Sequence, residues 1–354
     1  SIGGVYSYVL EQSKRCRVTA IARSAYDSIQ QDGLTIRSQK FGVISNWKPY
    51  RVLRKAEEAT DRNYRLIICT FKCLPDLLPT TTILAPFLIP FCGTSPNDKP
   101  KAKPPTVVLI QNGIGIEQPI AEAFPSIHII STVAWIGANL ISKPNQPTII
   151  EHGKMEKLVF GLYDDEKRSL GKIEVDLLAS LLKDGGGQIE VLEHIQPARW
   201  AKNLWNAAFS TMCSLSRSPV SALIAPEVLP HTLPVVRRTM LEMIYVARAL
   251  GYREIDLPAK AVDDTIQLTI SHYQGSQSQN NEDVFEEDEE EEEGKEETKH
   301  TTFKPSMLLD LENGRPMELE PIVGAVLDRA RAKAIETPRL DLFEYPFLHF
   351  MFYF

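Results

Sequence analysis

Three polar residues spaced four apart, Lys202, Asn206 and Ser210, lie in a segment that otherwise holds mostly Trp, Leu, Phe and Ala. This spacing stacks side chains on one face of a helix. A face turned to water usually carries several charges, but this one has a single cation, which is costly on an apolar helix unless something uses it. Hydride transfer to a ketone leaves an alkoxide that a positioned ammonium can stabilise and protonate. The pattern therefore favours carbonyl reduction, with Lys202 as proton donor and Asn206 orienting the substrate; a solvated amphipathic helix is the alternative.

The first four residues, Ser1-Ile2-Gly3-Gly4, precede an apolar helical stretch and are typical of the end of a dinucleotide-binding turn. Gly3 would be the last glycine of that turn, which lets the helix pack closely on the sheet. About twenty residues on, where such folds contact the ribose, the chain has Arg23, which suits a 2'-phosphate and so NADPH. A flexible terminus is the alternative. In the cofactor interpretation, the first strand and the first glycines of the turn are missing from the start of the sequence.

Two more polar segments directly follow apolar runs. Lys72 comes after the run 65–70, and Asn112 comes after the run 106–111. In doubly wound sheets, ligands bind at the carboxyl ends of the strands. We therefore predict that both residues face the cofactor, the alternatives being a solvated lysine and an ordinary Asn-Gly turn.

An ordered pattern returns at residues 306–320, after an acidic tract. Ser306 and Glu318 in this segment are either functional or helix-start residues, because Ser favours caps and Glu favours first turns. Pro316 at a first helical position would favour the interpretation of Glu318 as a helix-start residue.

The composition is that of an ordinary globular protein of two domains: 354 residues, 43% hydrophobic and 24% charged. Residues 282–297 hold 12 acidic residues and one lysine, so the rest of the chain carries about +4 of the net −7. That charge is too slight and dispersed to indicate nucleic acid binding, and no apolar stretch reaches the roughly 20 residues of a membrane span. The five cysteines show no paired metal spacing, so we expect no metal site and a reduced compartment, cytoplasmic with a mitochondrial one left open.

Apolar runs at 17–22, 65–70, 106–111 and 128–134 alternate with helical segments, which predicts a parallel, doubly wound sheet. From residue 197 onward the pattern is helical, with segments 199–217, 233–250, 260–273 and 316–334. We predict an α/β domain over 1–165 and an all-α domain over 190–342, interrupted by a disordered acidic insertion at 274–302.

In their order and spacing, these segments resemble the ketopantoate reductase (2-dehydropantoate 2-reductase) family over nearly the whole chain. The matching residues are Ser1–Gly4, Arg23, Thr70–Lys72, Gln111–Gly115, Trp200–Lys202 with Asn206, and Ser306–Asp310 followed by Glu318. The resemblance implies an NADPH-binding Rossmann-like domain, a helical domain like the C-terminal one of 6-phosphogluconate dehydrogenase, and an active site in the cleft between them. It also implies reduction of 2-dehydropantoate to pantoate, on the route to pantothenate and coenzyme A. The amino-acid sequences of several segments resemble a fungal branch of the family.

By position, the resemblance assigns Lys202 as the catalytic lysine and Glu318 as an acidic residue beside the reaction centre. Asn206 and Ser306 match substrate contacts, Lys72 and Asn112 match cofactor-side residues, and Arg23 matches the 2'-phosphate contact. Ser210 stands where the family commonly has a second asparagine in contact with substrate, and residues 343–354 depart from the expected closing helix. We therefore keep two alternatives: a reductase of another 2-oxoacid or ketone on the same fold, and a non-catalytic NADP-binding or interaction protein. The sequence leaves the oligomeric state open, with a homodimer among the alternatives.

Overall fold

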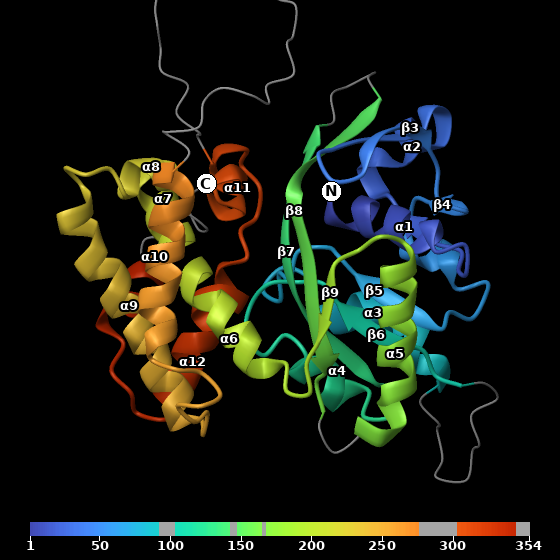
Figure 1. Cartoon of the computed structure of the whole chain (residues 1–354). Helices are drawn as coiled ribbons and strands as arrows, with labels where there is room; N and C mark the ends of the chain where they lie inside the picture. Colours follow the sequence, from blue (N-terminus) through green and yellow to red (C-terminus); the bar gives the residue numbers. More distant parts are fainter. Residues whose placement is uncertain (92–102, 142–146, 165–167, 276–302, 345–354) are drawn as a thin grey trace, which may run out of the picture. The chain divides into compact units, whose positions relative to one another are not determined.

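The computed structural model describes residues 1–91, 103–141, 147–164, 168–275 and 303–344 (Figure 1). The chain divides into two compact units, Ser1–Arg199 and Trp200–Phe354. The predicted acidic insertion lies outside the described residues apart from its first two positions, which end a helix. Most of the divergent closing stretch, from residue 345 onward, lies outside them as well.

The first unit is built on a seven-stranded sheet with the order β3-β2-β8-β7-β6-β5 and with β9 beside β8. Its strands are β2 (Leu34–Ser38), β3 (Gly42–Trp47), β5 (Leu66–Cys69), β6 (Thr106–Leu109), β7 (Ile129–Ile141), β8 (Thr148–Leu162) and β9 (Ile189–Val191). Strands β5, β6 and β7 run parallel, whereas β7 and β8 are antiparallel. The predicted parallel sheet is therefore mixed, because these last two long strands are consecutive in the chain and pair directly.

Two short strands, β1 (Thr19–Ile21) and β4 (Arg51–Leu53), form a separate parallel pair. The strands predicted within 17–22, 65–70, 106–111 and 128–134 are confirmed as β1, β5, β6 and the first part of β7.

Helices cover both faces of the seven-stranded sheet. Helices α1 (Ile2–Gln12) and α5 (Arg168–Asp184) pack on one face, and α3 (Thr80–Leu88) and α4 (Gln118–Ala123) on the other; α2 (Tyr26–Asp32) follows β1. Alternate residues of β6 serve the two cores: Val108 packs with α1 and α5, whereas Val107 and Leu109 pack with α3 and α4. Burial on both faces explains why this strand is continuously apolar, and it confirms the predicted doubly wound α/β class.

The described residues of the second unit form helices and the loops between them, with no strand. Its helices are α6 (Gln196–Trp205), which begins in the first unit, α7 (Thr211–Ser216), α8 (Val220–Leu223), α9 (Leu229–Ala249), α10 (Lys260–Gly275), α11 (Ser306–Glu312) and α12 (Ala325–Ala332). The longest, α9, buries Val236, Met240, Met243 and Ala247 at intervals of three and four, as the periodicity predicts. The predicted all-α class of this part of the chain is confirmed.

Two π-helical turns interrupt the helices of the second unit: Asn206–Ser210 (η5) between α6 and α7, and Glu320–Gly324 (η6) before α12. Such turns form hydrogen bonds one residue wider than an α-helix, and they occur frequently at functional sites. Helical structure at 199–217 is confirmed, but it is not one regular α-helix, because η5 separates α6 from α7. The helix predicted over 316–334 begins only at Leu319, so Pro316 is not at a first helical position.

Helix α1 is held against α5 by a close backbone approach at Gly185. A Cβ atom there would lie 1.8 Å from the carbonyl oxygen of Val9, whereas at Gly137 in β7 nothing lies within 4 Å of an added Cβ. We expect Gly185→Ala to lower the free energy of unfolding by about 1–3 kcal/mol, because the helices must move apart. Gly137→Ala is the matched control and should leave the urea midpoint nearly unchanged. Equal midpoints for the two variants would contradict this packing.

Candidate active site

The loops after β5 and β6 lie together at the carboxyl edge of the sheet. Cys69 and Leu109 are paired in the parallel register, so the two strands end at the same level. Beyond them, the Gln111 side-chain amide donates to the carbonyl oxygen of Phe71 at 2.8 Å, which fastens one loop to the other. The half-buried side chains of Lys72 and Asn112 belong to these joined loops, at the edge where such folds bind ligands.

The amino end of α1 meets the same edge. Gly3 lies inside the helix, and a Cβ atom on it would be only 2.5 Å from Oγ1 of Thr70, which follows β5. A larger residue would require the Thr70 side chain to move, as expected for the last glycine of a dinucleotide-binding turn. The flexible-terminus alternative for these glycines is wrong. The first backbone N–H groups of α1 are thus directed to a place suited to an anion.

Arg23 follows β1 and also lies near the start of α1. Burial and the nearby charge of Arg23 lower the pKa of the Ser1 amino group. Arg23 has a left-handed backbone with φ of 48° and an exposed side chain. The structure therefore brings together segments carrying Gly3, Arg23, Lys72 and Asn112.

A buried thiol lies beneath the Lys72 loop. Burial, with a smaller effect of the neighbouring Cys73, raises the pKa of Cys69 to about 12. The thiol is therefore protonated and unreactive at neutral pH, and it belongs to the core rather than to the chemistry of this edge.

A buried ion pair that the sequence did not reveal supports the Asn112 loop. Arg199 is 3% exposed and donates to the carbonyl oxygens of Gln111 and Gly113, both at 2.9 Å. Its Nε lies 3.0 Å from Oε1 of Glu117, which is fully buried. The available signal was a Glu as the single charged residue of the segment 114–120 and an Arg in a helix with few charges.

In the second unit, the residues expected to do chemistry lie at and beside the first π-turn. Lys202 is in the last turn of α6, Asn206 begins η5, and Ser210 ends it. Lys202 and Asn206 are half-buried and Ser210 is 3% exposed, so the alternative of a solvated face is wrong. Because the turn is π-helical, the predicted α-helical stacking holds from Lys202 to Asn206 but is not simply continued to Ser210.

The segments carrying Ser306 and Glu318 approach the same turn. Helix α11, which begins with Ser306, packs against η5, and η6, which follows Glu318, also contacts η5. Ser306 is exposed and is the first residue of α11, with Pro305 at the cap position, so Ser306 is a helix-start residue but not the cap. Glu318 is half-buried and precedes the helix.

Asn203 fastens α6 to the second π-turn. This buried residue follows Lys202, and its amide donates to the carbonyl oxygen of Ile322 at 2.8 Å. In η6 the Glu320 side chain folds over Gly324, where an added Cβ would lie 1.9 Å from Oε2 of Glu320. The geometry of η6 thus depends on a side chain from α6 and on a glycine.

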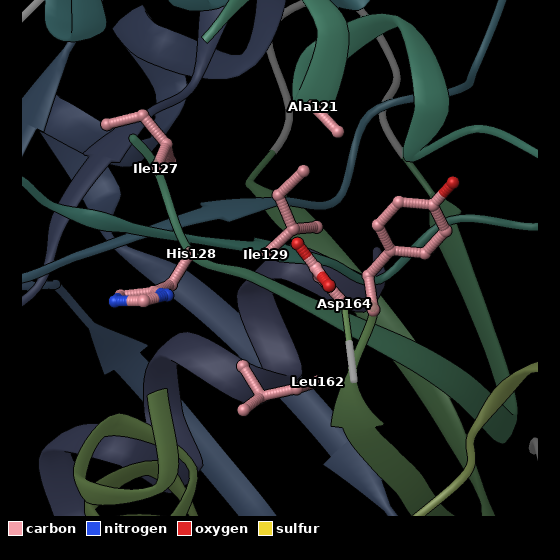
Figure 2. A pocket seen from close by; sticks show the side chains of 7 residues that line it. Ala121, Ile127, His128, Ile129, Leu162 and Asp164 are labelled. Carbon is pink, nitrogen blue, oxygen red and sulfur yellow. The ribbon is translucent and has the colours of Figure 1, made fainter. Parts of the chain in front are cut away.

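A small pocket lies elsewhere in the first unit (Figure 2). It is lined by Ala121, Ile127, His128, Ile129, Leu162, Tyr163 and Asp164. These residues include the amino end of β7, the opposite edge of the parallel strands from Lys72 and Asn112. The pocket therefore contains none of the predicted site residues.

In the described part of the chain, no helix combines the length and hydropathy of a membrane span.

Profiles of one family match both units. The profile described as "Ketopantoate reductase PanE/ApbA" matches residues 1–165, and "Ketopantoate reductase PanE/ApbA C terminal" matches residues 194–344. The chain belongs to the ketopantoate reductase family and is, by class, a nicotinamide-dependent oxidoreductase.

Individual relatives agree with this assignment. A 2-dehydropantoate 2-reductase of Nostoc sp. is 22% identical, over 96% of this chain and 89% of its own. The crystal structure of 2-dehydropantoate 2-reductase from Methylococcus capsulatus has a TM-score of 0.72 at 26% identity, covering 99% of this chain and 93% of its own. A ternary structure of D-mandelate dehydrogenase with NADH and anilino(oxo)acetate has a TM-score of 0.69 at 19% identity, covering 97% and 93% of the two chains. The last likeness concerns the fold alone.

The bond from Asn203 to Ile322 gives a direct test of the link between α6 and η6. We expect Asn203→Leu to lower the free energy of unfolding by about 1 kcal/mol or more, because the carbonyl of Ile322 loses its side-chain donor. Asn313→Ala is the control, since Asn313 makes the same kind of bond to Leu309 at an exposed position; it should cost no more than about 0.5 kcal/mol. Urea denaturation of both variants distinguishes the two, and equal losses would argue against a special role for Asn203.

Proposed function

We propose that this protein reduces 2-dehydropantoate to pantoate with NADPH. The observation that carries the proposal is the half-buried Lys202 at the π-turn of a helix with few charges, in a chain of the ketopantoate reductase family. An ammonium in such surroundings is retained when something uses it. The reaction needs a cation that stabilises the developing alkoxide and then supplies its proton.

The first unit would hold the cofactor. The N–H groups of Ile2 and Gly3, which precede the first intrahelical bond of α1, suit the pyrophosphate, and the exposed cation of Arg23 suits the 2'-phosphate. Lys72 and Asn112, on the joined loops at the same edge, are the side chains proposed to contact the remainder of the dinucleotide. The bound cofactor supplies the hydride.

The second unit would hold the substrate and the proton donor. Asn206, Ser210 and Ser306 offer hydrogen bonds to the carboxylate and hydroxyl groups of the 2-oxoacid, which leaves the Lys202 ammonium for the carbonyl oxygen. Glu318 is the proposed acidic residue beside the reaction centre. A carboxylate near Lys202 would favour its charged form and so keep the proton available.

A reductase of another 2-oxoacid is the second candidate. It is supported by Ser210, which is shorter than the asparagine common at this position in the family. A panel of 2-oxoacids with branched aliphatic and aromatic side chains decides between the two candidates through kcat/KM. A higher kcat/KM for an aromatic 2-oxoacid than for 2-dehydropantoate would favour the second candidate.

Lys202 provides the test of catalysis itself. We expect Lys202→Ala to lower kcat by about a hundredfold or more, the usual contribution of a positioned acid or base, while NADPH affinity stays close to that of the unchanged chain. Lys260→Ala is the control, because Lys260 is an exposed helical lysine paired with Asp264. Steady-state assays of NADPH oxidation give the rates and fluorescence titration gives the affinity. Retained turnover in Lys202→Ala would remove the assigned role, and NADPH binding without turnover in the unchanged chain would favour a non-catalytic protein.

Arg23 provides the test of cofactor choice. We expect Arg23→Asn to raise the Kd for NADPH by about tenfold or more, the cost of losing a hydrogen-bonded charge pair, and to leave the Kd for NADH nearly unchanged. Asparagine tolerates the left-handed backbone at this position, so the change removes the cation with little strain. Arg17→Asn is the control; Arg17 lies before β1 and stacks on Tyr50. Equal losses of affinity for NADPH and NADH would contradict a 2'-phosphate contact.

A further inference from the structure

All three guanidinium nitrogens of Arg199 donate hydrogen bonds to backbone and side-chain oxygens of the first unit. Besides the carbonyls of Gln111 and Gly113, it donates from Nη2 to the carbonyl oxygen of Thr132 at 2.8 Å and from Nε to Oγ of Ser131 at 3.0 Å. The planar guanidinium presents its donors in a fixed fork, so several acceptors are held in one geometry at once. Arg199 thus fixes two separate stretches of chain, the loop after β6 and the third and fourth residues of β7.

The two loop carbonyls bound by Nη1 belong to the residues on either side of Asn112. A single nitrogen therefore holds the backbone before and after this side chain. Gly113 has φ of 105°, a conformation open to glycine but rarely to other residues. The guanidinium holds the carbonyls on both sides of Asn112, so the conformation of this loop depends on Arg199.

Glu117 supplies the counter-charge and is itself tied down. Its Oε1 accepts from Oγ of Ser131 and from Nε2 of Gln196, in addition to the ion pair with Arg199. A buried ion pair of this kind gives little net stability, since desolvation offsets the attraction. What the pair does provide is position, because the acceptors of the guanidinium cannot shift without leaving a buried charge unpaired.

We propose that Arg199 is a positioning residue for the nicotinamide cofactor: it holds the backbone on both sides of Asn112 so that this side chain meets the cofactor in one fixed orientation. The inference rests on the proposed function, in which Asn112 contacts the dinucleotide. The guanidinium does not touch the cofactor itself and acts through the loop. Its place on α6 also ties that loop to the helix whose next turn carries Lys202.

Arg199→Lys in the full chain tests the proposal. Lysine keeps the charge for Glu117, but one ammonium cannot reproduce the planar fork. We expect the Kd and the KM for NADPH to rise by about tenfold or more, as small misplacements of binding groups commonly cost, with a much smaller change in kcat at saturating NADPH. A purely structural role would lower the fraction of folded protein and kcat together, without this split between KM and kcat.

Arg248 offers a matched control in the second unit. Its guanidinium likewise donates to three backbone carbonyls, those of Tyr252, Arg253 and Leu257, and pairs with Glu254. Arg248→Lys should lower the thermal midpoint as Arg199→Lys does, but leave the Kd for NADPH unchanged. If Arg199→Lys does not fold, Ser131→Ala removes one acceptor of the guanidinium and should raise the Kd by a smaller factor.

Three outcomes would overturn the proposal. Wild-type affinity for NADPH in folded Arg199→Lys, or in Ser131→Ala where that variant is needed, contradicts it alone and leaves the proposed function standing. An equal loss of affinity in Arg248→Lys shows a general effect of destabilisation and contradicts it as well. Failure of the unchanged chain to bind any nicotinamide cofactor overturns the proposed function, and this inference with it.

Discussion

The buried charge of Arg199 imposes the constraint on which the carboxyl edge of the first unit depends. A guanidinium that is 3% exposed must be hydrogen-bonded and neutralised, or the fold loses several kcal/mol in desolvation. Its partners come from the loop after β6, from β7 and from Glu117 at the start of α4. Each of these segments is therefore held where it can bind the guanidinium. The loop after β5 is held as well, because the Gln111 side chain bonds to it.

Close backbone approaches provide the second constraint on this edge. Gly3 brings the start of α1 against Thr70, and Gly185 brings α5 against the middle of α1. With a helix fixed at both places, its free N–H groups stay at the ends of β1 and β5. Electrostatic preorganisation of this kind is useful only when the donors do not move as the anion binds.

Much of this arrangement could be predicted from the sequence, because it follows from local patterns. The continuous apolar run of β6 predicts a strand buried on both faces, and polar residues after such strands must lie at the carboxyl edge. Lys72 and Asn112 were placed in this way. The partners of Arg199 could not be, since they are mostly backbone carbonyls far away in sequence, and carbonyls carry no sequence signal.

The π-turns could not be predicted from the sequence either, for a related reason. A five-residue segment such as Asn206–Ser210 has the same apolar and polar spacing whether it is α-helical or π-helical. The choice depends on contacts with distant segments, among them the bond from Asn203 to Ile322. The residue types of Ser306 and Glu318 suggested helix starts; Ser306 does begin α11, whereas Glu318 precedes its helix.

The two units therefore position their candidate site residues by different means. In the first unit, strand ends and a buried charge fix the backbone around Lys72 and Asn112, and regular structure leads directly to the site. In the second unit, Lys202 and Asn206 lie where the regular helix gives way to a wider turn, whose conformation costs free energy unless the surrounding helices maintain it. Residues of the second kind depend on packing at a distance. Under the proposed function, changes in η6 should therefore alter catalysis without touching the substrate, whereas changes at the strand ends of the first unit should act through the cofactor.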